Sequence, residues 1–292
     1  MTAAENRKEH MSKAAHAGRA GARAGGSAVP DRYDLYELCV QDAPTMARFL
    51  LAVHGGAPRV MREDFCGGGA VAREWAALGR GYRAIGVDLD EGALARLRAQ
   101  AAAARVAGRV RCVRADVMDC VLRADVISAT NFPIGYWHTR RDLVKYLRAT
   151  RRRLSRGGIF VCDMYGGASA LKRMKKRRVV PLGSERAAGR SVEYTWEQRR
   201  ADAATQRVID ALHFRVKRAG RVVAELRDAF IYDWRLWSIA ELREAMEEAG
   251  FRSVEVYDRL ADAVDDKGRV YVRQAEELGR DWVVYLVARM TG

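Results

Sequence analysis

Three glycines follow a short apolar strand early in the chain, and acidic residues stand directly before them. Val60–Gly69 reads Val-Met-Arg-Glu-Asp-Phe-Cys-Gly-Gly-Gly, and Ala70–Leu78 continues with the pattern of a helix that Gly79 can end. A strand, a glycine turn and a helix place backbone N–H groups at the carboxyl end of a parallel strand, where open α/β sheets bind ligands. Glycine is needed there because a Cβ would block the turn or the ligand. The sequence therefore predicts a ligand site around Gly67–Gly69.

Two classes of ligand compete for this turn. Gly67–Ala72 fits the dinucleotide fingerprint G-x-G-x-x-G/A, and Asp88 lies 21 residues after Gly67 (88 − 67). Glu63 and Asp64 would repel a pyrophosphate, however, and would attract a ligand with an ammonium group and no phosphate. S-adenosylmethionine is such a ligand, because it joins an amino acid to a nucleoside through a sulfonium cation. NAD is the alternative.

Acidic residues also stand at the ends of later apolar strands. These strands are predicted at Tyr82–Asp90, Arg109–Val113 with Asp116 beyond it, and Ile159–Asp163. A carboxylate at the second strand end accepts ribose hydroxyls in either nucleotide family, so Asp88 indicates a nucleoside without choosing between the two ligands. The repeated acid at Glu63, Asp88 and Asp116 is more specific than any one motif, and it favours S-adenosylmethionine.

Glu63–Gly69 resembles the first motif of the class I S-adenosylmethionine-dependent methyltransferases, which runs acid-x-Gly-x-Gly-x-Gly. Phe65 departs from it, because it stands where the first glycine is usual; it either narrows the methionine pocket or packs under the strand. The resemblance, which spans about Asp31–Met290, implies an α/β fold with a three-layer Rossmann-like sheet. Five parallel strands, a C-terminal antiparallel pair and an inserted antiparallel β cap are expected.

The resemblance also implies a set of cofactor contacts. Asp88 would bind the ribose, Asp116 would accept from the adenine amino group or cap a helix, and Val117 with Leu89 would enclose the ring. An N-terminal segment often lies over the cofactor in this family, and its two tyrosines either do so or pack the segment onto the core. The predicted cofactor residues are Tyr33, Tyr36, Glu63, Phe65, Cys66, Gly67, Gly69, Asp88, Leu89, Asp116, Val117 and Asn131.

The segment after the fourth predicted strand, Ala124–Thr130, borders the transferring methyl group in this family. It reads Asn131-Phe-Pro-Ile-Gly-Tyr-Trp137 and lacks the Asn-Pro-Pro-Tyr of enzymes that methylate nucleic-acid bases, which weakens that activity. Asp163 and His213 are the candidate general bases, and solvent is the favoured surrounding of His213. The predicted substrate-binding residues are Tyr136, Asp163, Trp196, His213, Tyr232 and Trp234.

The chain divides by composition into a tail, a core and an insertion. Residues 1–29 have almost no large apolar side chains and are expected to form a disordered basic tail. Residues 30–170 and 238–292 are expected to form the core, and residues 171–237 the insertion, which would cover the substrate. Within it, Lys172–Arg178 is interpreted as a solvated loop, and alternating apolar residues predict about three antiparallel strands between Ser191 and Arg235.

Composition limits the class of protein. The 292 residues are 49% hydrophobic and 30% charged, which is typical of a globular protein. Five scattered cysteines without a C-x-x-C pair indicate reduced thiols and no metal site. No apolar run reaches about 18 residues and no signal segment is evident, so a cytoplasmic location without membrane partners is expected. The net charge of +15 suits nucleic acid, anionic lipid or an acidic small molecule, although scattered arginines also occur without function.

The sequence thus predicts an S-adenosylmethionine-dependent methyltransferase that acts on a small molecule by in-line displacement. Three alternatives stay open: an RNA methyltransferase that uses residues 1–29 and Lys172–Arg178, an NAD-type oxidoreductase, and a non-catalytic protein that binds S-adenosylmethionine. The sequence does not indicate an oligomeric state.

Overall fold

A computed structural model describes residues 30–182, 189–258, 260 and 274–290, so the tail predicted at residues 1–29 lies outside the described residues. The chain divides into two compact units. The core unit consists of Asp42–Ala170 and Leu236–Gly292, and the insert unit of Met1–Gln41 and Leu171–Arg235. Each unit is described by itself.

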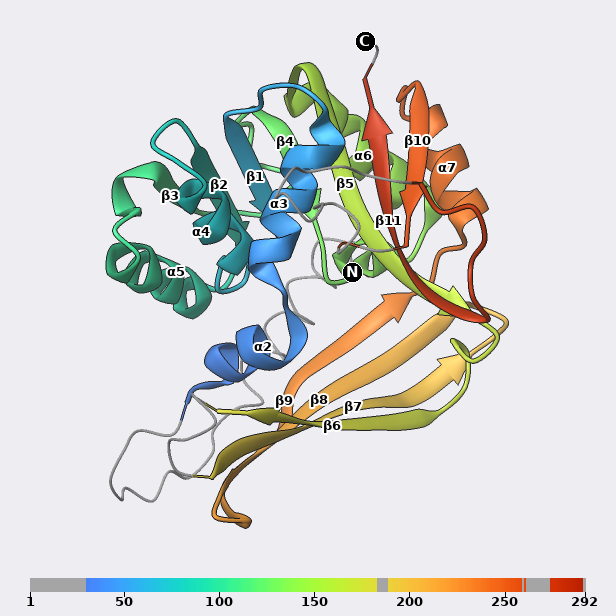
Figure 1. Ribbon diagram of the computed structural model, residues 1–292. Helices are drawn as coiled ribbons and strands as arrows, with labels where there is room; N and C mark the ends of the chain where they lie inside the picture. Colours follow the sequence, from blue (N-terminus) through green and yellow to red (C-terminus); the bar gives the residue numbers. More distant parts are fainter. Residues whose placement is uncertain (1–29, 183–188, 259, 261–273, 291–292) are drawn as a thin grey trace. The chain divides into compact units, whose positions relative to one another are not determined.

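Seven strands form the sheet of the core unit, in the order β10-β11-β5-β4-β1-β2-β3 (Figure 1). β1 to β5 run parallel, whereas β11 pairs antiparallel with both β5 and β10, which confirms the predicted arrangement. β5 extends beyond the predicted Ile159–Asp163 at both ends. The strands are Val60–Asp64 (β1), Arg83–Asp88 (β2), Val110–Arg114 (β3), Ala124–Ala129 (β4), Leu154–Gly167 (β5), Ser253–Tyr257 (β10) and Asp281–Arg289 (β11).

Helices cover both faces of this sheet. They are α3 (Ala43–His54), α4 (Ala70–Ala77), α5 (Glu91–Ala103), α6 (Arg140–Arg153) and α7 (Ile239–Glu248), with short 3-10 turns η1 (Ala107–Arg109) and η2 (Pro133–Tyr136). Glu63 on β1 contacts α4, and the next residue, Asp64, contacts α6. Because successive side chains of a strand point to opposite faces, α4 and α6 lie on opposite faces. The predicted three layers are confirmed.

Side chains cap the first turns of α3, α6 and α7. Asp42 accepts the N–H of Thr45 at the start of α3, and Thr139 accepts that of Asp142 at the start of α6. Ser238 opens α7 with a capping box. These local signals fix where the helices that flank the site begin.

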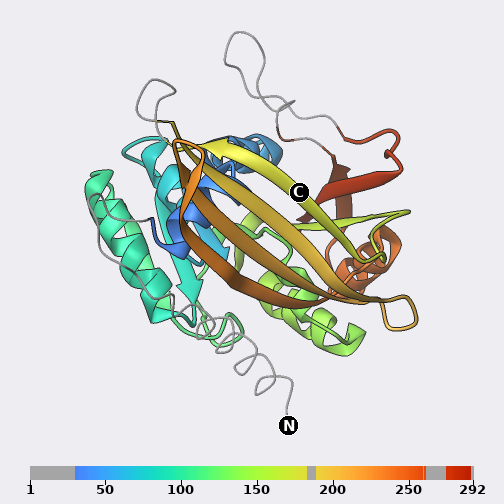
Figure 2. The same ribbon diagram turned by 90° about the horizontal axis from the view of Figure 1, so that it is seen from below.

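The insert unit is a four-stranded antiparallel sheet in the order β6-β7-β8-β9 (Figure 2). The strands are Met174–Pro181 (β6), Arg190–Asp202 (β7), Arg207–Arg218 (β8) and Arg221–Arg235 (β9). The prediction of about three strands between Ser191 and Arg235 is confirmed by β7, β8 and β9. The loop predicted at Lys172–Arg178 was wrong, because most of that block is the edge strand β6. Its basic side chains alternate between the two faces, and Lys176 and Arg178 lie over aromatic rings of β7.

Helix α2 (Arg32–Val40) belongs to the insert unit rather than to the core where the sequence placed it. Leu35 and Cys39 are buried with Val192, Phe214 and Val216 in the hydrophobic cluster of this unit. The buried side chains of α2 are thus covered by strands that follow more than 150 residues later, which no local pattern reveals.

None of the helices in the described part of the chain has the length and hydropathy required to cross a lipid bilayer.

Candidate functional site

The glycine loop after β1 folds as a tight left-handed turn. The N–H of Gly69 donates to the carbonyl of Cys66 at 2.7 Å, and the N–H of Cys66 donates to Val87 on β2 at 3.0 Å. Phe65 has φ 58°, a value that bulky residues rarely adopt, so the turn keeps a glycine-like backbone at the position where the methyltransferase motif has glycine. The ring of Phe65 lies 5.8 Å from that of Tyr136 and 6.3 Å from that of Tyr146. Phe65 therefore adopts a left-handed backbone conformation in the turn.

Gly67 and Gly69 of this loop have different surroundings. A Cβ on Gly69 would lie 2.5 Å from Leu97 of α5, so this glycine allows the helix to pack against the turn. A Cβ on Gly67 would meet nothing within 4 Å, although φ there is also positive. Gly67 thus presents bare backbone to open space, and this surface fits a ligand that approaches the backbone closely.

Two predicted acids hold this loop through backbone N–H groups. Asp88 is buried at the end of β2, where it accepts the N–H of Gly67 at 2.7 Å and that of Asp90 at 2.9 Å. Burial raises the pKa of this carboxyl above its ordinary value, against the effect of the two hydrogen bonds. Glu63 is buried as well and accepts the N–H of Ala72 in α4 at 2.9 Å. The structure brings both acids to the glycine loop.

Asp64 was predicted to repel phosphate at the glycine loop, but its side chain is turned away from that loop. Its carboxylate is 1% exposed and accepts from Arg62 Nε at 2.6 Å and from the Tyr146 hydroxyl at 3.0 Å. The charge of Asp64 is thus opposed by a guanidinium inside the protein. Of the two acids that were expected to repel a phosphate, only Glu63 points toward the helix that follows the loop.

The third acid, Asp116, stands in the irregular segment between β3 and β4. One of its oxygens accepts the N–H of Met118 at 2.8 Å, so it caps a local turn, which was the alternative to adenine binding. Val117 is buried, and Leu89 is half-buried at the end of β2. Because Ala115 donates to the carbonyl of Asp88 at 3.1 Å, this segment begins beside the ribose candidate.

Asp163 clamps the loop after β4. Its two oxygens accept the N–H of Asn131 at 2.8 Å and that of Phe132 at 2.7 Å. Asn131 and Phe132 both have a left-handed backbone conformation, with φ 69° and 67°, although neither residue is glycine. Burial raises the pKa of Asp163 to about 7. This carboxyl was a candidate base and substrate contact, but the structure uses it to fix the backbone that carries Asn131.

Several predicted cofactor residues have other surroundings. The thiol of Cys66 is buried against Leu94 and Leu97, and burial raises its pKa well above the ordinary value. Only the backbone of Cys66 can therefore serve a ligand. Tyr33 and Tyr36 pack against Phe230 of β9, with ring centroids 5.6 and 5.1 Å away, within the insert unit. The prediction that these tyrosines contact the cofactor stays untested.

The aromatic candidates of the insert unit lie on its apolar face. Trp234 is buried and stacks on Tyr232 at 4.3 Å, and Phe230 continues the row on the same strand. Trp196 is half-buried on β7 and belongs to the same hydrophobic cluster as Tyr232. The structure thus collects three of the predicted substrate residues on one sheet face.

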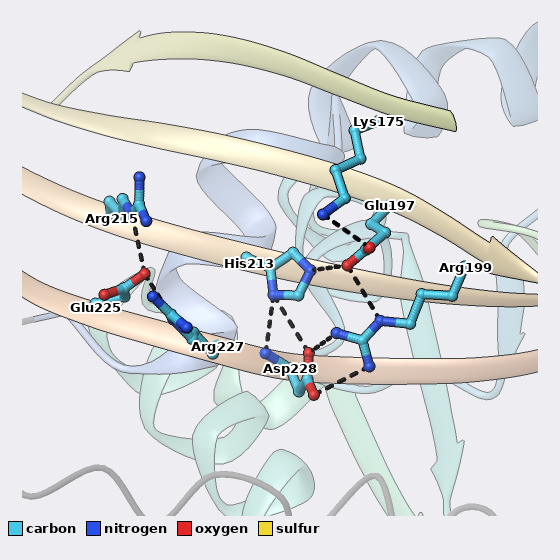
Figure 3. Close-up of polar contacts among 8 residues, drawn as sticks. All are labelled: Lys175, Glu197, Arg199, His213, Arg215, Glu225, Arg227 and Asp228. Carbon is cyan, nitrogen blue, oxygen red and sulfur yellow. Dashed lines mark hydrogen bonds and ion pairs between the residues drawn. The ribbon is translucent and has the colours of Figure 1, made fainter. Parts of the chain in front are cut away.

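His213 lies on the opposite face, within an ion-pair cluster rather than in solvent (Figure 3). Its Nδ1 accepts the N–H of Asp228 at 3.0 Å, so Nε2 carries the proton and donates to Glu197 at 3.0 Å. Arg199 bridges the carboxylates of Glu197 and Asp228, and Lys175 pairs with Glu197 at 2.9 Å. With both ring nitrogens engaged, His213 is held as a structural residue of the sheet.

The residues that support the segment between β3 and β4 were not among the predicted site residues. Arg62 is fully buried, and its guanidinium reaches carbonyls of that segment, as does that of Arg153. A signal was present, because Arg62 and Asp64 are alternate residues of a strand central to a parallel sheet. Both faces of such a strand are covered by helices, so two charges there must pair.

The comparisons with known proteins agree with this geometry. Residues 65–158 match the family model described as a methyltransferase domain. No curated protein sequence matches the chain. The sheet order, with an antiparallel strand between the fifth and sixth, also differs from the symmetric dinucleotide-binding order.

Solved structures share the fold at low sequence identity. A methyltransferase from Clostridium acetobutylicum ATCC 824, described as S-adenosylmethionine-dependent, is 14% identical with a TM-score of 0.66, and the match covers 89% of this chain and 98% of that one. CalS10 from Micromonospora echinaspora, an amino pentose methyltransferase, is 16% identical with a TM-score of 0.64, over 92% and 100%. KedS8 from Streptoalloteichus sp ATCC 53650, a sugar N-methyltransferase, is 19% identical with a TM-score of 0.59, over 92% and 97%.

The chain thus resembles a methyltransferase domain over residues 65–158. Its fold is the Rossmann-like class I fold of the S-adenosylmethionine-dependent methyltransferases.

Proposed function

We propose that the protein binds S-adenosylmethionine at the glycine loop and transfers its methyl group to a small-molecule acceptor. The observation that carries the proposal is the bare backbone of Gly67, held by the carboxylate of Asp88 at the carboxyl end of the parallel sheet. An acid-lined backbone surface favours a cationic nucleoside over a ligand with phosphates.

The residues around this loop would each bind a different part of the cofactor. Asp88 would accept from the ribose hydroxyls, Glu63 would keep the edge of the loop negative, and Val117 with Leu89 would enclose the adenine. Asp116 would accept from the adenine amino group with its side chain, while it also caps the turn at Met118. The same residues would hold the ligand in one orientation before any reaction.

S-adenosylmethionine, when bound, supplies a methyl group on a positively charged sulfur, which is already activated for displacement. The protein's task is then to position an acceptor and exclude water. The Asp163 clamp would serve positioning, because it fixes the Asn131–Phe132 backbone in one conformation. A dedicated general base is not required by this proposal.

A small-molecule acceptor is supported by the insert unit and by the fold relatives. The insert sheet presents a row of aromatic side chains that includes Trp196 and Tyr232, which suits the apolar faces of a sugar or of a ring compound. Two of the structures with this fold are described as a sugar N-methyltransferase and an amino pentose methyltransferase. We therefore propose an amine on a sugar-like molecule as the first acceptor class to examine.

Transfer of a labelled methyl group tests this proposal. The protein is incubated with S-adenosylmethionine and either a panel of amino sugars and small amines or total RNA at two salt concentrations. We expect label in a small-molecule fraction and release of S-adenosylhomocysteine. Label in RNA alone, with transfer that falls steeply with salt, would replace the proposal by the RNA alternative. Binding without transfer to any acceptor would indicate a non-catalytic protein.

A further inference from the structure

A charged cluster is buried beneath the segment that follows β3. Arg62 is fully buried in the central strand β1 and donates from Nε to Asp64, which in turn accepts the hydroxyl of Tyr146 from α6. Tyr146 is itself fully buried and stacks on Trp137, with ring centroids 4.9 Å apart. The guanidinium is thus held from behind by a carboxylate whose own position is fixed by a rigid aromatic residue.

The remaining donors of Arg62 all reach one stretch of backbone. Nη1 donates to the carbonyls of Cys120 at 2.7 Å and Leu122 at 3.1 Å, and Nη2 donates to that of Val117 at 3.0 Å. Arg153, in the last turn of α6, donates to Val117 at 2.6 Å and to Met118. Two guanidinium groups therefore bind four carbonyls between residues 117 and 122.

This stretch has no helix or strand of its own to satisfy those carbonyls. Residues 116–122 contain only turns and irregular backbone, and a buried carbonyl without a partner is costly. Arginine is suited to the task because its five N–H groups lie in one rigid plane, so a single side chain can set several carbonyl directions at once. The segment's shape is consequently dictated by side chains of β1 and α6.

We infer that Arg62 and Arg153 are positioning residues for nucleobase recognition, with Asp64 and Tyr146 orienting Arg62. They set the backbone on which Asp116 and Val117 stand, and so determine where the adenine-accepting carboxylate lies. This inference rests on the proposed function, because it assumes that the segment binds the adenine of an S-adenosyl ligand. A role in stability alone would not affect the choice between nucleobases.

The test compares two ligands that differ along the Watson–Crick edge of the base, which includes the position that Asp116 would read. S-adenosyl-L-homocysteine carries an amino group there, and S-inosyl-L-homocysteine carries a carbonyl oxygen that a carboxylate repels. Calorimetry gives the dissociation constant of each ligand for the full-length protein. The wild type is expected to prefer the adenosyl ligand by tenfold or more.

Three variants are compared with the wild type. Arg62→Met/Asp64→Leu/Tyr146→Phe removes the cluster without stranding a buried charge. Arg153→Met removes the second guanidinium from a helix end, and it decides the test if the triple variant does not fold. Arg109→Met is the matched control, because Arg109 also donates to a backbone carbonyl, that of Ala76 at 3.1 Å, but away from this segment.

Both the triple variant and Arg153→Met are expected to lose the preference for adenine by about tenfold, the equivalent of one hydrogen bond that is no longer aligned. Arg109→Met should keep the preference even if its melting temperature falls. Folded variants that keep the wild-type preference would overturn the inference, and so would a wild type that binds both ligands equally. A wild type that binds neither ligand would overturn the proposed function as well.

Discussion

Each unit of this protein contains a polar cluster with an arginine–aspartate ion pair, and the two pairs differ in how far they are exposed to solvent. In the core unit, Arg62 and Asp64 form an ion pair with side chains 0% and 1% exposed. In the insert unit, Arg199 and Asp228 form an ion pair with side chains 34% and 35% exposed. A ring side chain contacts the aspartate of each pair: the Tyr146 hydroxyl donates to the Asp64 carboxylate, and Nδ1 of His213 accepts the backbone N–H of Asp228.

The difference lies in what each cluster can stabilise. Water competes for the groups of the exposed cluster, so its ion pairs add little free energy and mainly hold neighbouring strands in register. The buried cluster has no such competitor, and its guanidinium makes hydrogen bonds that no solvent molecule replaces. Depth, rather than the number of contacts, therefore decides which cluster can fix the backbone beside it.

The largest effect is expected from breaking the buried pair. Arg62→Met alone leaves Asp64 charged or forced to take up a proton inside the protein, and should lower the free energy of unfolding by about 3–5 kcal/mol. Urea denaturation measures this change. The triple variant Arg62→Met/Asp64→Leu/Tyr146→Phe is the control, and it should lose distinctly less because it strands no charge. A single variant within about 1 kcal/mol of the wild type would contradict the contrast between the clusters.

The second test concerns Asp163, a buried carboxylate that is held by backbone N–H groups instead of by arginine. Its folded pKa is about 7, above the ordinary value of 3.8, so the folded protein keeps this proton to higher pH than the unfolded chain. The stability that this group contributes is fully present below about pH 4 and is lost as the pH rises through 7.

Asp163→Asn should remove this dependence. The unfolding free energy of the wild type, relative to that of the Asn variant, should fall by about 1 kcal/mol or more between pH 4 and pH 8. Denaturation curves at several pH values measure the difference. A difference that stays constant, or rises with pH, would show that the hydrogen bonds from Asn131 and Phe132 outweigh burial.

The smallest effect is expected in the insert unit. A double-mutant cycle with Arg199→Met and Asp228→Asn should give a coupling free energy below about 1 kcal/mol, because both side chains are one-third exposed. Raising the salt concentration should reduce it further. A coupling free energy above about 2 kcal/mol that is insensitive to salt would show that this pair is as strong as a buried one, and would contradict the contrast between the two clusters.

Much of the core unit was predictable because its signals are local. The strand ends with their acids, the glycine loop and the caps at Asp42, Thr139 and Ser238 are each written within a few neighbouring residues. The resemblance of Glu63–Gly69 to a known motif added the sheet order. The turn at Phe65 shows the limit of that approach, since its positive φ is imposed by the hydrogen bonds and packing around it.

The features that sequence analysis missed depend on contacts between distant residues. The strand pattern indicates that Arg62 and Asp64 pair, but the backbone carbonyls that the Arg62 guanidinium also binds lie 55 to 60 residues further along the chain. The basic run at Lys172–Arg178 reads as a loop until pairing with β7 makes it a strand.

The bulges of the insert sheet are equally hidden. The register shifts beside Arg199 in β7 and opposite His213 in β9, and Asp228 takes φ 52°. Neither position carries glycine, so only the assembled sheet reveals that the bulges turn Arg199 and Asp228 toward each other.

Calorimetric titration with S-adenosylmethionine and with NAD tests the central claim most directly. We expect the wild type to bind S-adenosylmethionine and not NAD, and Asp88→Asn to lose about 1–3 kcal/mol of that binding free energy because a buried acceptor of hydrogen bonds is replaced. Binding of NAD in preference to S-adenosylmethionine, or an Asp88→Asn variant with unchanged affinity, would contradict the assignment of the glycine loop as a site for a cationic nucleoside.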